Sequence, residues 1–540
     1  MVKVTSVQTI SGRVQSKWMK VKKVHVNSQS KIGKCTKTVP EESCLARRFK
    51  EFASNTALHG YNHIVREDST KWERIAWILI VVIATVVAAV LLYISWQLNL
   101  ETPTITVIES THYPISNVPF PAVTICSMNS ISARTAMSLA LNMKRPSDVS
   151  ADRLSKLFQL VLHFQGVGEA RKEDYNLLHN ILQTNQMSVV NLTSVLKPKC
   201  TDLLKNCRWK GTESRCEEIF QSINTIEGIC CSFNYYGLTT NNFAPKVAQK
   251  RPKEPRRTSS CGYQTGLTVI LTPMSDDYHS SFFSSYGVRV LVHDPYDFPD
   301  DNAETKAISR KMIAFVMVYP ETTYSTSAVR SLSPDARYCY FHDEHRLSHM
   351  QRYSYVNCLA ECRTEIAYRL CGCVPYFLPN NGSYRVCEMN EMECARENRP
   401  IYFGALPGLN KTIVGTAEPS IQHTPCNCLP DCQLNQYPTE ITSAHLNRSY
   451  SFSRMGLFKG INITDHTSLT VFFGDLVSTH YRKDIYQNWL SLLASFGGIL
   501  GLLLGFSFVA GFELIYFFTI RVLFDRWASR KNKVTHWAIK

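Results

Sequence analysis

Two long stretches without a charged residue constrain this chain more than any other feature. The first covers residues 75–100 and the second residues 485–512, and both exceed the ~20 residues that a helix needs to cross a bilayer. No signal-peptide pattern precedes the first stretch, so we expect it to act as a signal anchor. The sequence therefore predicts two transmembrane segments, at residues 75–100 and 485–520.

Positive charge flanks these segments. Residues 1–74 carry 15 Lys and Arg against 6 Asp and Glu, and residues 521–540 carry 6 against 1. Basic flanks stay in the cytoplasm, so both terminal segments are predicted to be cytoplasmic and residues 101–484 extracellular, in a multi-pass protein of the plasma membrane. Because the basic residues flank spans and do not coat a domain, no nucleic-acid partner is expected.

Cysteines and glycosylation sequons agree with this topology. Seventeen of the 19 cysteines lie in residues 101–484. This agrees with an extracellular location, because disulfides form in the oxidising environment outside the cell. The same region holds five Asn-x-Ser/Thr sequons, which mark surface positions of secreted domains. We expect glycans at Asn191, Asn381, Asn410, Asn447 and Asn462.

The spacing of four cysteines predicts a staple between two elements. Cys358 and Cys362 lie one helical turn apart, and Cys426 and Cys428 face one side of a predicted strand. Two rungs would join the helix to the strand. Zinc is the rival interpretation of such spacing, but disulfides are favoured outside the cell. No Ser/His/Asp, phosphate-loop or metalloprotease pattern occurs, so the chain is predicted not to be an enzyme and to need no metal or cofactor.

The region between the spans mixes strands and helices. The segment "AVTIC" at residues 122–126 and two segments within residues 284–325 are predicted strands, and residues 136–187 carry apolar residues at helical spacing. Residues 246–258 are basic and contain proline; a solvated loop is predicted, with a protease processing site as the alternative.

The second apolar segment contains glycines spaced by four, at positions 497, 501 and 505. Such a face lets another helix backbone approach closely, and ordinary helix pairing is one explanation. The length of this segment argues against helix pairing as the whole explanation. Its 36 residues would span about 54 Å as a straight helix, whereas the hydrocarbon core of a bilayer is about 30 Å thick. We therefore predict a break at Gly505-Phe506-Ser507.

A break at that depth implies a water-filled path. Non-helical backbone inside a membrane is tolerated only where it is buried in protein or lines water, and carbonyl rings facing water build ion filters. One segment cannot enclose a pore, so several subunits must do so. Glu513, six residues beyond the break, would then face the lumen. A pore is the favoured hypothesis and a structural helix pair the alternative.

Several motifs resemble the epithelial sodium channel/degenerin family, which includes the acid-sensing channels and the insect pickpocket proteins. "FASNTALHGYNHI" is similar to the family's segment before the first span, "FPAVTIC" to the motif that opens its extracellular domain, and "LLASFGGILGLLLGFSFVAGFE" to its second span. "CCSFN" and the cysteine pattern from residue 339 are most similar to the pickpocket branch. The resemblance extends over nearly the whole chain from about residue 45.

The resemblance implies a fold and a function. The fold is an α+β membrane protein in which two transmembrane helices flank a large disulfide-rich, hand-like ectodomain of palm, β-ball, finger, knuckle and thumb, with the cysteine-rich thumb at about residues 339–432. Three such subunits, identical or related, form a channel. The function is that of a sodium-selective, amiloride-sensitive, non-voltage-gated cation channel subunit, with sodium only as the permeant ion. The alternative is a non-conducting accessory or receptor subunit. ATP-gated channels share the two-span trimeric plan, but they would lack "FPAVTIC".

The resemblance also assigns roles to single residues. The selectivity filter falls on Gly505, Phe506 and Ser507, the degenerin position near the outer mouth on Ala494, further pore-lining positions on Gly501 and Glu513, and the pre-span pore motif on His59 and Gly60. Phe506 departs from the family, which has a small residue there. The histidine pair that follows the first span in acid-sensing channels is also missing, which puts proton gating in doubt.

By order, the family's disulfides imply seven pairs in this chain. They are Cys126–Cys230, Cys207–Cys216, Cys339–Cys432, Cys358–Cys428, Cys362–Cys426, Cys371–Cys394 and Cys373–Cys387. Cys200, Cys231 and Cys261 are left over, and parity favours one more bond among them plus one free or intermolecular thiol.

Overall fold

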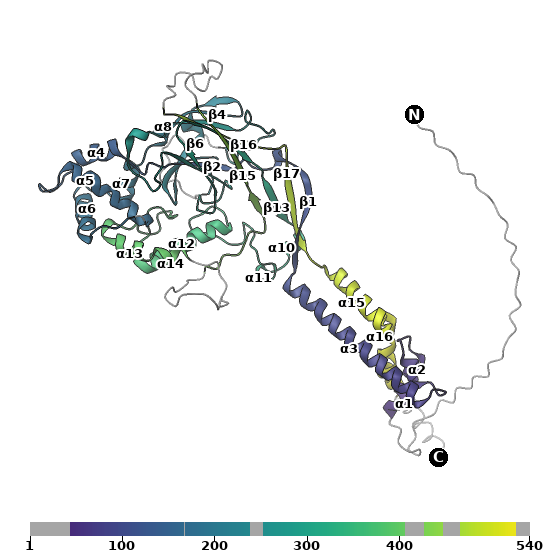
Figure 1. The fold of residues 1–540 in the computed structure, drawn as a ribbon. Coiled ribbons are helices and arrows are strands. Elements are labelled where there is room, and N and C mark those ends of the chain that lie inside the picture. Colours follow the sequence, from purple (N-terminus) through teal and green to yellow (C-terminus); the bar gives the residue numbers. More distant parts are fainter. Residues whose placement is uncertain are drawn as a thin grey trace, which may run out of the picture. The chain divides into compact units, whose positions relative to one another are not determined.

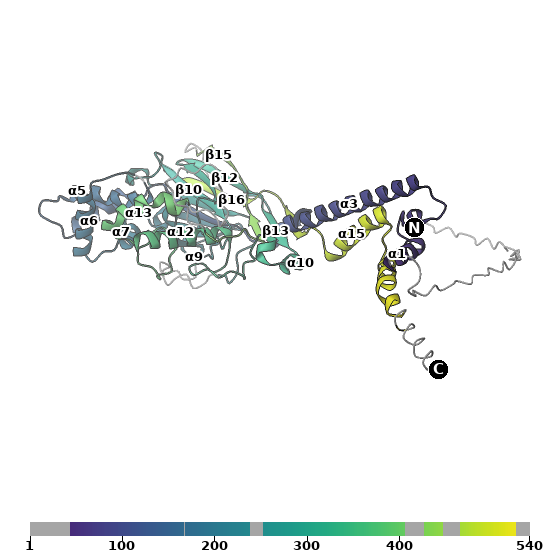
Figure 2. The ribbon, with the colours of Figure 1, turned by 90° about the horizontal axis from the view of Figure 1, so that it is seen from below.

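The computed structural model describes residues 44–166, 168–237, 252–404, 426–446, 465–524 and 527. The chain divides into two compact units, one made of residues 1–94 and 493–540 and the other of residues 95–492. Mixed helix and strand content agrees with the predicted α+β class. Figures 1 and 2 show the elements of both units from two directions.

Two sheets pack around a common apolar core in the larger unit. The core draws on inward-facing residues of both sheets, such as Val290 and Val316, and includes Trp209. The five-stranded sheet has the order β11 (Glu304–Ser309), β10 (Gly287–His293), β2 (Ala122–Ser127), β7 (Gly228–Phe233) and β6 (Phe220–Thr225). The six-stranded sheet has the order β15 (Thr439–His445), β12 (Met312–Val318), β16 (Thr467–Phe473), β8 (Leu267–Leu271), β4 (Leu204–Trp209) and β5 (Thr212–Ser214).

The predicted strand at "AVTIC" is β2, and all six of its residues are buried. It lies between β10 and β7, both antiparallel to it. A strand with a neighbour on each side and both faces covered needs a continuous apolar run rather than alternation. This position explains why the "FPAVTIC" motif is so apolar.

A third sheet contains the two strands that are joined in the chain to the apolar segments. Its order is β1 (Thr104–Pro114), β17 (Val477–Ile485), β13 (Glu321–Ser325) and β14 (Leu434–Gln436). β1 pairs antiparallel with β17 along its length, from Thr104↔Ile485 to Pro114↔Val477. A short two-stranded sheet joins β3 (Ile131–Ser132) and β9 (Tyr278–Ser280).

Helices gather around a second core in the same unit. In both views α5, α6 and α13 lie together at the end of this unit far from β13 (Figures 1 and 2). The helices of this core are α4 (Ala133–Asn142), α5 (Ala151–Leu157), η2 (Phe158–Gln165), α6 (Lys172–Thr184), α7 (Val189–Leu196), α12 (Tyr355–Cys371), η5 (Met389–Glu391), α13 (Met392–Glu397) and α14 (Arg399–Phe403). Shorter helical turns elsewhere are η1 (Ile115–Asn117), α8 (Cys200–Leu203), α9 (Cys216–Ile219), η4 (Ser275–Asp277), α10 (Ser327–Arg330) and α11 (Pro334–Arg337).

Disulfides fasten α12 to the segment before β14. The structure contains the seven pairs expected from the resemblance. An eighth joins Cys200 to Cys231, and Cys261 is a half-buried free thiol. The expected strand at Cys426 and Cys428 is only partly present: Cys426 is a single bridge residue, the chain then turns tightly, since the Cys428 amide donates to the Cys426 carbonyl at 2.7 Å, and the next continuous strand is β14.

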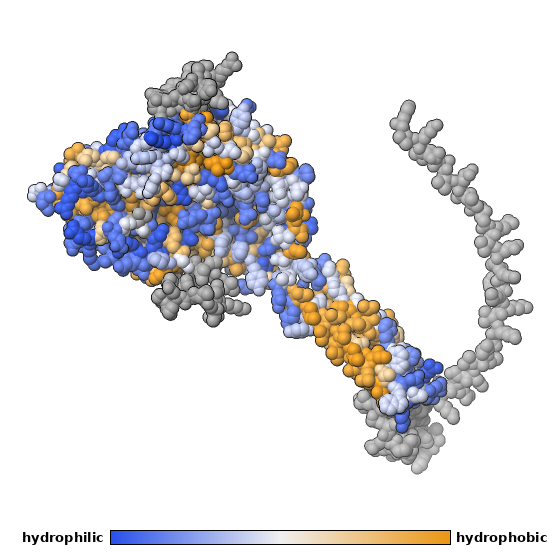
Figure 3. Space-filling model, in the orientation of Figure 1, coloured by the Kyte–Doolittle hydropathy of each residue, from blue (hydrophilic) through white to orange (hydrophobic). Residues whose placement is uncertain are grey.

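The smaller unit is built from apolar helices. α3 (Lys71–Glu101) is long and apolar enough to cross a membrane, and α15 (Trp489–Leu504) with the following helix forms a second candidate span that is bent by 70°. α15 begins four residues after the predicted start at 485, because Ile485 still pairs with Thr104 in β17. The side chains of α3 and α15 expose a continuous apolar surface (Figure 3).

Loss of one rung of the cysteine ladder should destabilise the larger unit strongly. Removing a native disulfide from a secreted domain typically costs 2–5 kcal/mol, so Cys358→Ser and Cys428→Ser should each lower the thermal midpoint of the purified protein and reduce its amount at the cell surface. Cys261→Ser is the matched control, because that thiol has no disulfide partner. A Cys358→Ser protein as stable as Cys261→Ser would contradict the ladder.

Candidate functional site

The second apolar segment breaks at the three predicted residues. α15 ends at Leu504, and α16 (Phe508–Ile515) begins after Gly505, Phe506 and Ser507. Gly505 has φ +66°, a left-handed conformation that costs other residues roughly 1–2 kcal/mol. Its amide donates to the Gly501 carbonyl at 3.0 Å, which closes the last turn of α15. The glycine is therefore required by backbone geometry.

Ser507 starts the second half of the segment. It is the N-cap of α16, and its Oγ accepts a hydrogen bond from the Ala510 amide at 3.2 Å. The residue is exposed in the single chain. Its hydroxyl hydrogen is not used by this cap, so the side chain both fixes the helix start and keeps polar character on an open surface.

Phe506 points into the chain's own core. Its ring is half-buried and packs against the cluster formed by Phe52, Leu58 and Ala510. A Cβ placed on Gly511 would lie 3.4 Å from the end of this ring. The bulky side chain at the centre of the tripeptide thus occupies apolar space within one subunit.

The pre-span motif meets the break directly. The His59 amide donates to the Leu504 carbonyl at 3.0 Å, and the His59 ring lies so close to Gly505 that a Cβ there would be 2.6 Å from it. Gly60, with φ +83°, lies against Val81 of α3, where an added Cβ would be 2.7 Å from the Val81 side chain. Two segments at opposite ends of the sequence thus form one site.

Glu513 contacts the segment that precedes the first span. It is half-buried, and the Thr56 hydroxyl donates to its Oε2 at 3.5 Å. The lumen-facing role stays a prediction, and this contact with the pre-span segment was not predicted. The spacing of Glu513 from the break does not indicate that Thr56 is its partner.

The remaining predicted pore positions lie on open surface of the single chain. Ala494 is exposed, and nothing lies within 4 Å of a Cβ built on Gly497. At Gly501 the only such neighbour is the Phe506 carbonyl oxygen at 3.9 Å. Gly497 therefore lies open in the described part of the chain, whereas Gly501 is half-buried and Gly505, the last of the glycines spaced by four, is covered by His59.

Two of the five sequons can be placed. Asn191 is exposed at the start of α7. Asn381 is half-buried, and its Nδ2, the atom that would carry a glycan, donates to the Ser348 carbonyl at 2.9 Å. Asn410, Asn447 and Asn462 lie outside the described residues.

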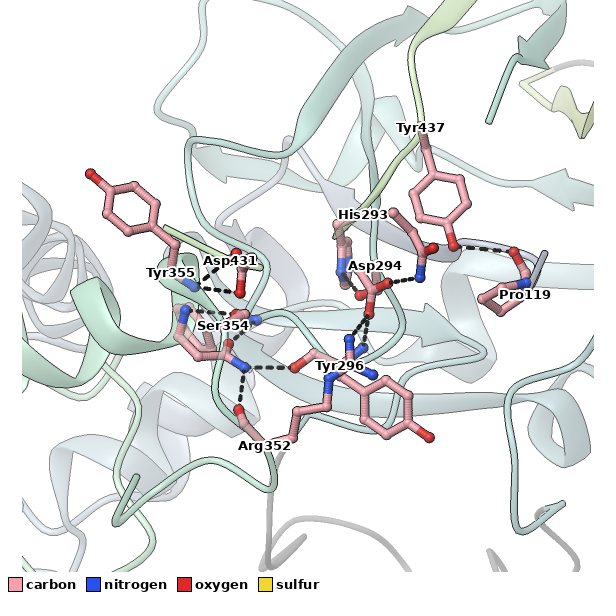
Figure 4. A network of polar contacts seen from close by, with 12 residues as sticks. Pro119, His293, Asp294, Tyr296, Arg352, Ser354, Tyr355, Asp431 and Tyr437 are labelled. Carbon is pink, nitrogen blue, oxygen red and sulfur yellow. Dashed lines mark hydrogen bonds and ion pairs between the residues drawn. The ribbon is translucent and has the colours of Figure 1, made fainter. Parts of the chain in front are cut away.

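A buried polar network holds the start of the ladder helix α12, and sequence reasoning missed it. Arg352 Nη2 lies 3.6 Å from Asp294 Oδ1, and the Tyr355 amide donates to Asp431 Oδ2 at 3.1 Å (Figure 4). Ser354 caps the helix. In the sequence, Asp294 is followed by a proline and Asp431 directly precedes Cys432, and neither position by itself identifies a network of charges.

Two carboxyl groups at this junction, those of Asp431 and Asp297, have raised pKa values. Burial raises the pKa of Asp431 to about 6, and the nearby Asp294 adds to the shift, while the Tyr355 amide and Arg352 oppose it. Burial and Asp294 also raise the pKa of Asp297, in the loop after β10. The Arg352 guanidinium therefore lies near Asp294, Asp297 and Asp431 at a largely buried junction.

Comparisons with known proteins agree on one family. The model of the family described as "Amiloride-sensitive sodium channel" matches residues 52–517. Pickpocket protein 11 of Drosophila melanogaster is 27% identical over 485 residues, which cover 90% of this chain and 78% of that protein. Sodium channel protein Nach of Drosophila ananassae is 25% identical, with 90% of this chain and 89% of that protein covered. The bile acid-sensitive ion channel of Mus musculus is 24% identical, with 87% of each chain covered.

Substitution of the glycine at the break tests its geometry. Gly505→Ala should destabilise the protein by roughly 1–2 kcal/mol or more, from the left-handed backbone alone, with the clash against His59 in addition. Thermal stability of the detergent-solubilised chain, followed by size-exclusion chromatography, measures this. Gly498→Ala is the control, since a Cβ there meets nothing within 4 Å and the backbone is helical. Equal stability of the two variants would contradict the site.

The raised pKa of Asp431 predicts a pH dependence of stability. In the unfolded chain this carboxyl has a pKa of about 3.9, whereas in the folded chain it is about 6. The folded state thus holds the proton in this window, so this group's contribution to stability rises as pH falls from about 6 to about 4. Asp431→Asn, which mimics the protonated form, should reduce the change in thermal midpoint between pH 7 and pH 5. Asp335→Asn, which changes an exposed acid, should leave this change in thermal midpoint as it is in the unsubstituted protein. An equal change in the unsubstituted protein and in both variants would contradict the raised pKa of Asp431.

Proposed function

This chain belongs to the amiloride-sensitive sodium channel family, and from that premise we propose that it is a subunit of a sodium-selective, amiloride-sensitive, non-voltage-gated cation channel. The family model matches most of the chain, including α3 and both halves of the broken segment. The members of this family are ion channels and not enzymes. The relatives include proteins named as sodium channels and pickpocket proteins, which confirms the resemblance stated from the motifs.

The broken apolar segment is the observation that carries the proposal. Backbone at Gly505 leaves helical geometry within a segment suited to a membrane, and such backbone must be buried in protein or line water. Members of the family assemble as oligomers, and we infer a homo- or heterotrimer whose three broken segments surround one path. Carbonyl oxygens and the Ser507 hydroxyls would there replace part of the water shell of sodium.

The orientation of Phe506 supports conduction by this subunit. A ring directed toward the path would block a belt of small residues, but this ring packs against Phe52 and Ala510 of its own chain. We therefore favour a conducting subunit over the non-conducting accessory or receptor subunit. The same reasoning gives Ala494 the role of the small residue near the outer mouth, because it is exposed in the single chain and free to meet other copies.

The charge pattern supports the proposed orientation. Residues 1–74 and 521–540 carry nearly all of the chain's net positive charge, which supports a cytoplasmic location for both. The eight disulfides found among the described residues lie between residues 126 and 432, in the part proposed to be extracellular. The plasma membrane is the proposed location, and sodium is the permeant ion rather than a cofactor.

Recording of whole-cell current tests the function and the filter together. We expect a current carried by sodium, blocked by amiloride, and with a sodium/potassium permeability ratio that changes in Ser507→Asp. Glu513→Gln should change conductance more than selectivity, because Glu513 lies beyond the break and contacts Thr56. No current from a chain proven to reach the surface, alone or with related subunits, would favour the accessory role. A Ser507→Asp channel with unchanged selectivity would refute the filter assignment.

A further inference from the structure

The helix before the first span touches the end of the second span through one ion pair and one aromatic cluster. α1 (Cys44–Asn55) places Glu51 Oε1 2.6 Å from Arg521 Nη2. The next residue, Phe52, is 2% exposed, and its ring centroid lies 5.8 Å from that of Phe517 and 5.5 Å from that of Phe518. These contacts all lie within the smaller unit.

A π-helical turn lies at this double contact. Residues Tyr516–Ile520 form η7, directly after α16. π-helices occur mostly as single turns inside α-helices, and such turns are frequent at functional sites. Here Phe517 and Phe518, adjacent in sequence, both contact the same ring. The Arg521 guanidinium follows at once and lies 5.4 Å above the Phe517 ring.

The same helix is tied to the break by a short chain of hydrogen bonds. The Thr56 amide donates to the Phe52 carbonyl at 2.9 Å, and the Leu58 amide donates to the Thr56 hydroxyl at 3.4 Å. The His59 amide then donates to the Leu504 carbonyl. Residues 52–59 thus connect the ion pair to the break through these hydrogen bonds, and a shift of α1 would be passed along them to His59.

We propose that Glu51 and Arg521 form a latch that fixes α1 against the end of the second span and thereby holds His59 on the break at Gly505. The inference rests on the proposed channel function, and it gives these two residues a positioning role that is separate from the filter. Opening of the latch should change the ratio of open to closed channels more than ion selectivity, because neither Glu51 nor Arg521 contacts residues 505–507 in the described part of the chain and the effect reaches them only through His59.

Charge exchange tests the latch. Glu51→Arg and Arg521→Glu should each shift the open-to-closed ratio in the same direction, by roughly two- to five-fold, the range typical of a partly exposed ion pair. The double exchange should restore at least half of the shift. Lys50→Glu and Glu67→Lys form the matched control, because this pair also involves α1, at 3.3 Å, but does not touch the second span. The control variants should leave the ratio unchanged.

The outcomes separate the latch from the channel proposal. Single variants that shift gating without rescue in the double exchange, or a control pair with an equal effect, would overturn the latch while the current itself upholds the function. A chain that carries no current under any condition would refute the conducting role. In that case the same cycle is measured as thermal stability of the purified full chain, where absence of coupling between positions 51 and 521 would overturn the latch and coupling would support the contact.

Discussion

The hydrogen bond between the His59 amide and the Leu504 carbonyl is the contact on which the smaller unit depends. An unpaired backbone group in a membrane costs several kcal/mol, so a helix that breaks inside an apolar segment must find partners for its freed ends. Here the pre-span segment supplies a donor for one freed carbonyl, and the Ser507 hydroxyl supplies an acceptor for a freed amide of the next helix. The glycines at 60 and 505 leave room for neighbouring side chains, since the Val81 side chain lies against Gly60 and the His59 ring lies against Gly505.

This arrangement gives neighbouring residues different tasks. Gly505 permits the left-handed turn, Phe506 anchors the turn in the chain's own core, and Ser507 begins the next helix. A tripeptide in which the central side chain faces inward leaves backbone and hydroxyl oxygens as its remaining polar surface. That division makes the bulky Phe506 compatible with the proposed filter, at a position where the family has a small residue.

The larger unit follows a different principle. Its strands bury two continuous apolar faces against each other, whereas the helical part around α12 is fastened by cysteines and by a buried network of charges. Arg352 forms an ion pair with Asp294, and burial together with the charge of Asp294 raises the pKa of the nearby Asp431. The disulfides at α12 hold the chain together regardless of the protonation of this network, because they are covalent bonds.

The two apolar segments, the break at 505–507 and the central strand at 122–126 could be predicted from the sequence, and the family resemblance implied seven cysteine pairs. Each of these predictions uses the length or hydropathy of one segment, the backbone freedom of one glycine, or a motif, and all of these are properties of residues close together in the sequence. Only the tertiary structure decided that Cys200 pairs with Cys231, that Phe506 faces inward, that Glu513 meets Thr56 and that Glu51 meets Arg521. Each of these depends on which segments distant in sequence lie side by side, and neither periodicity nor charge along the chain carries that information.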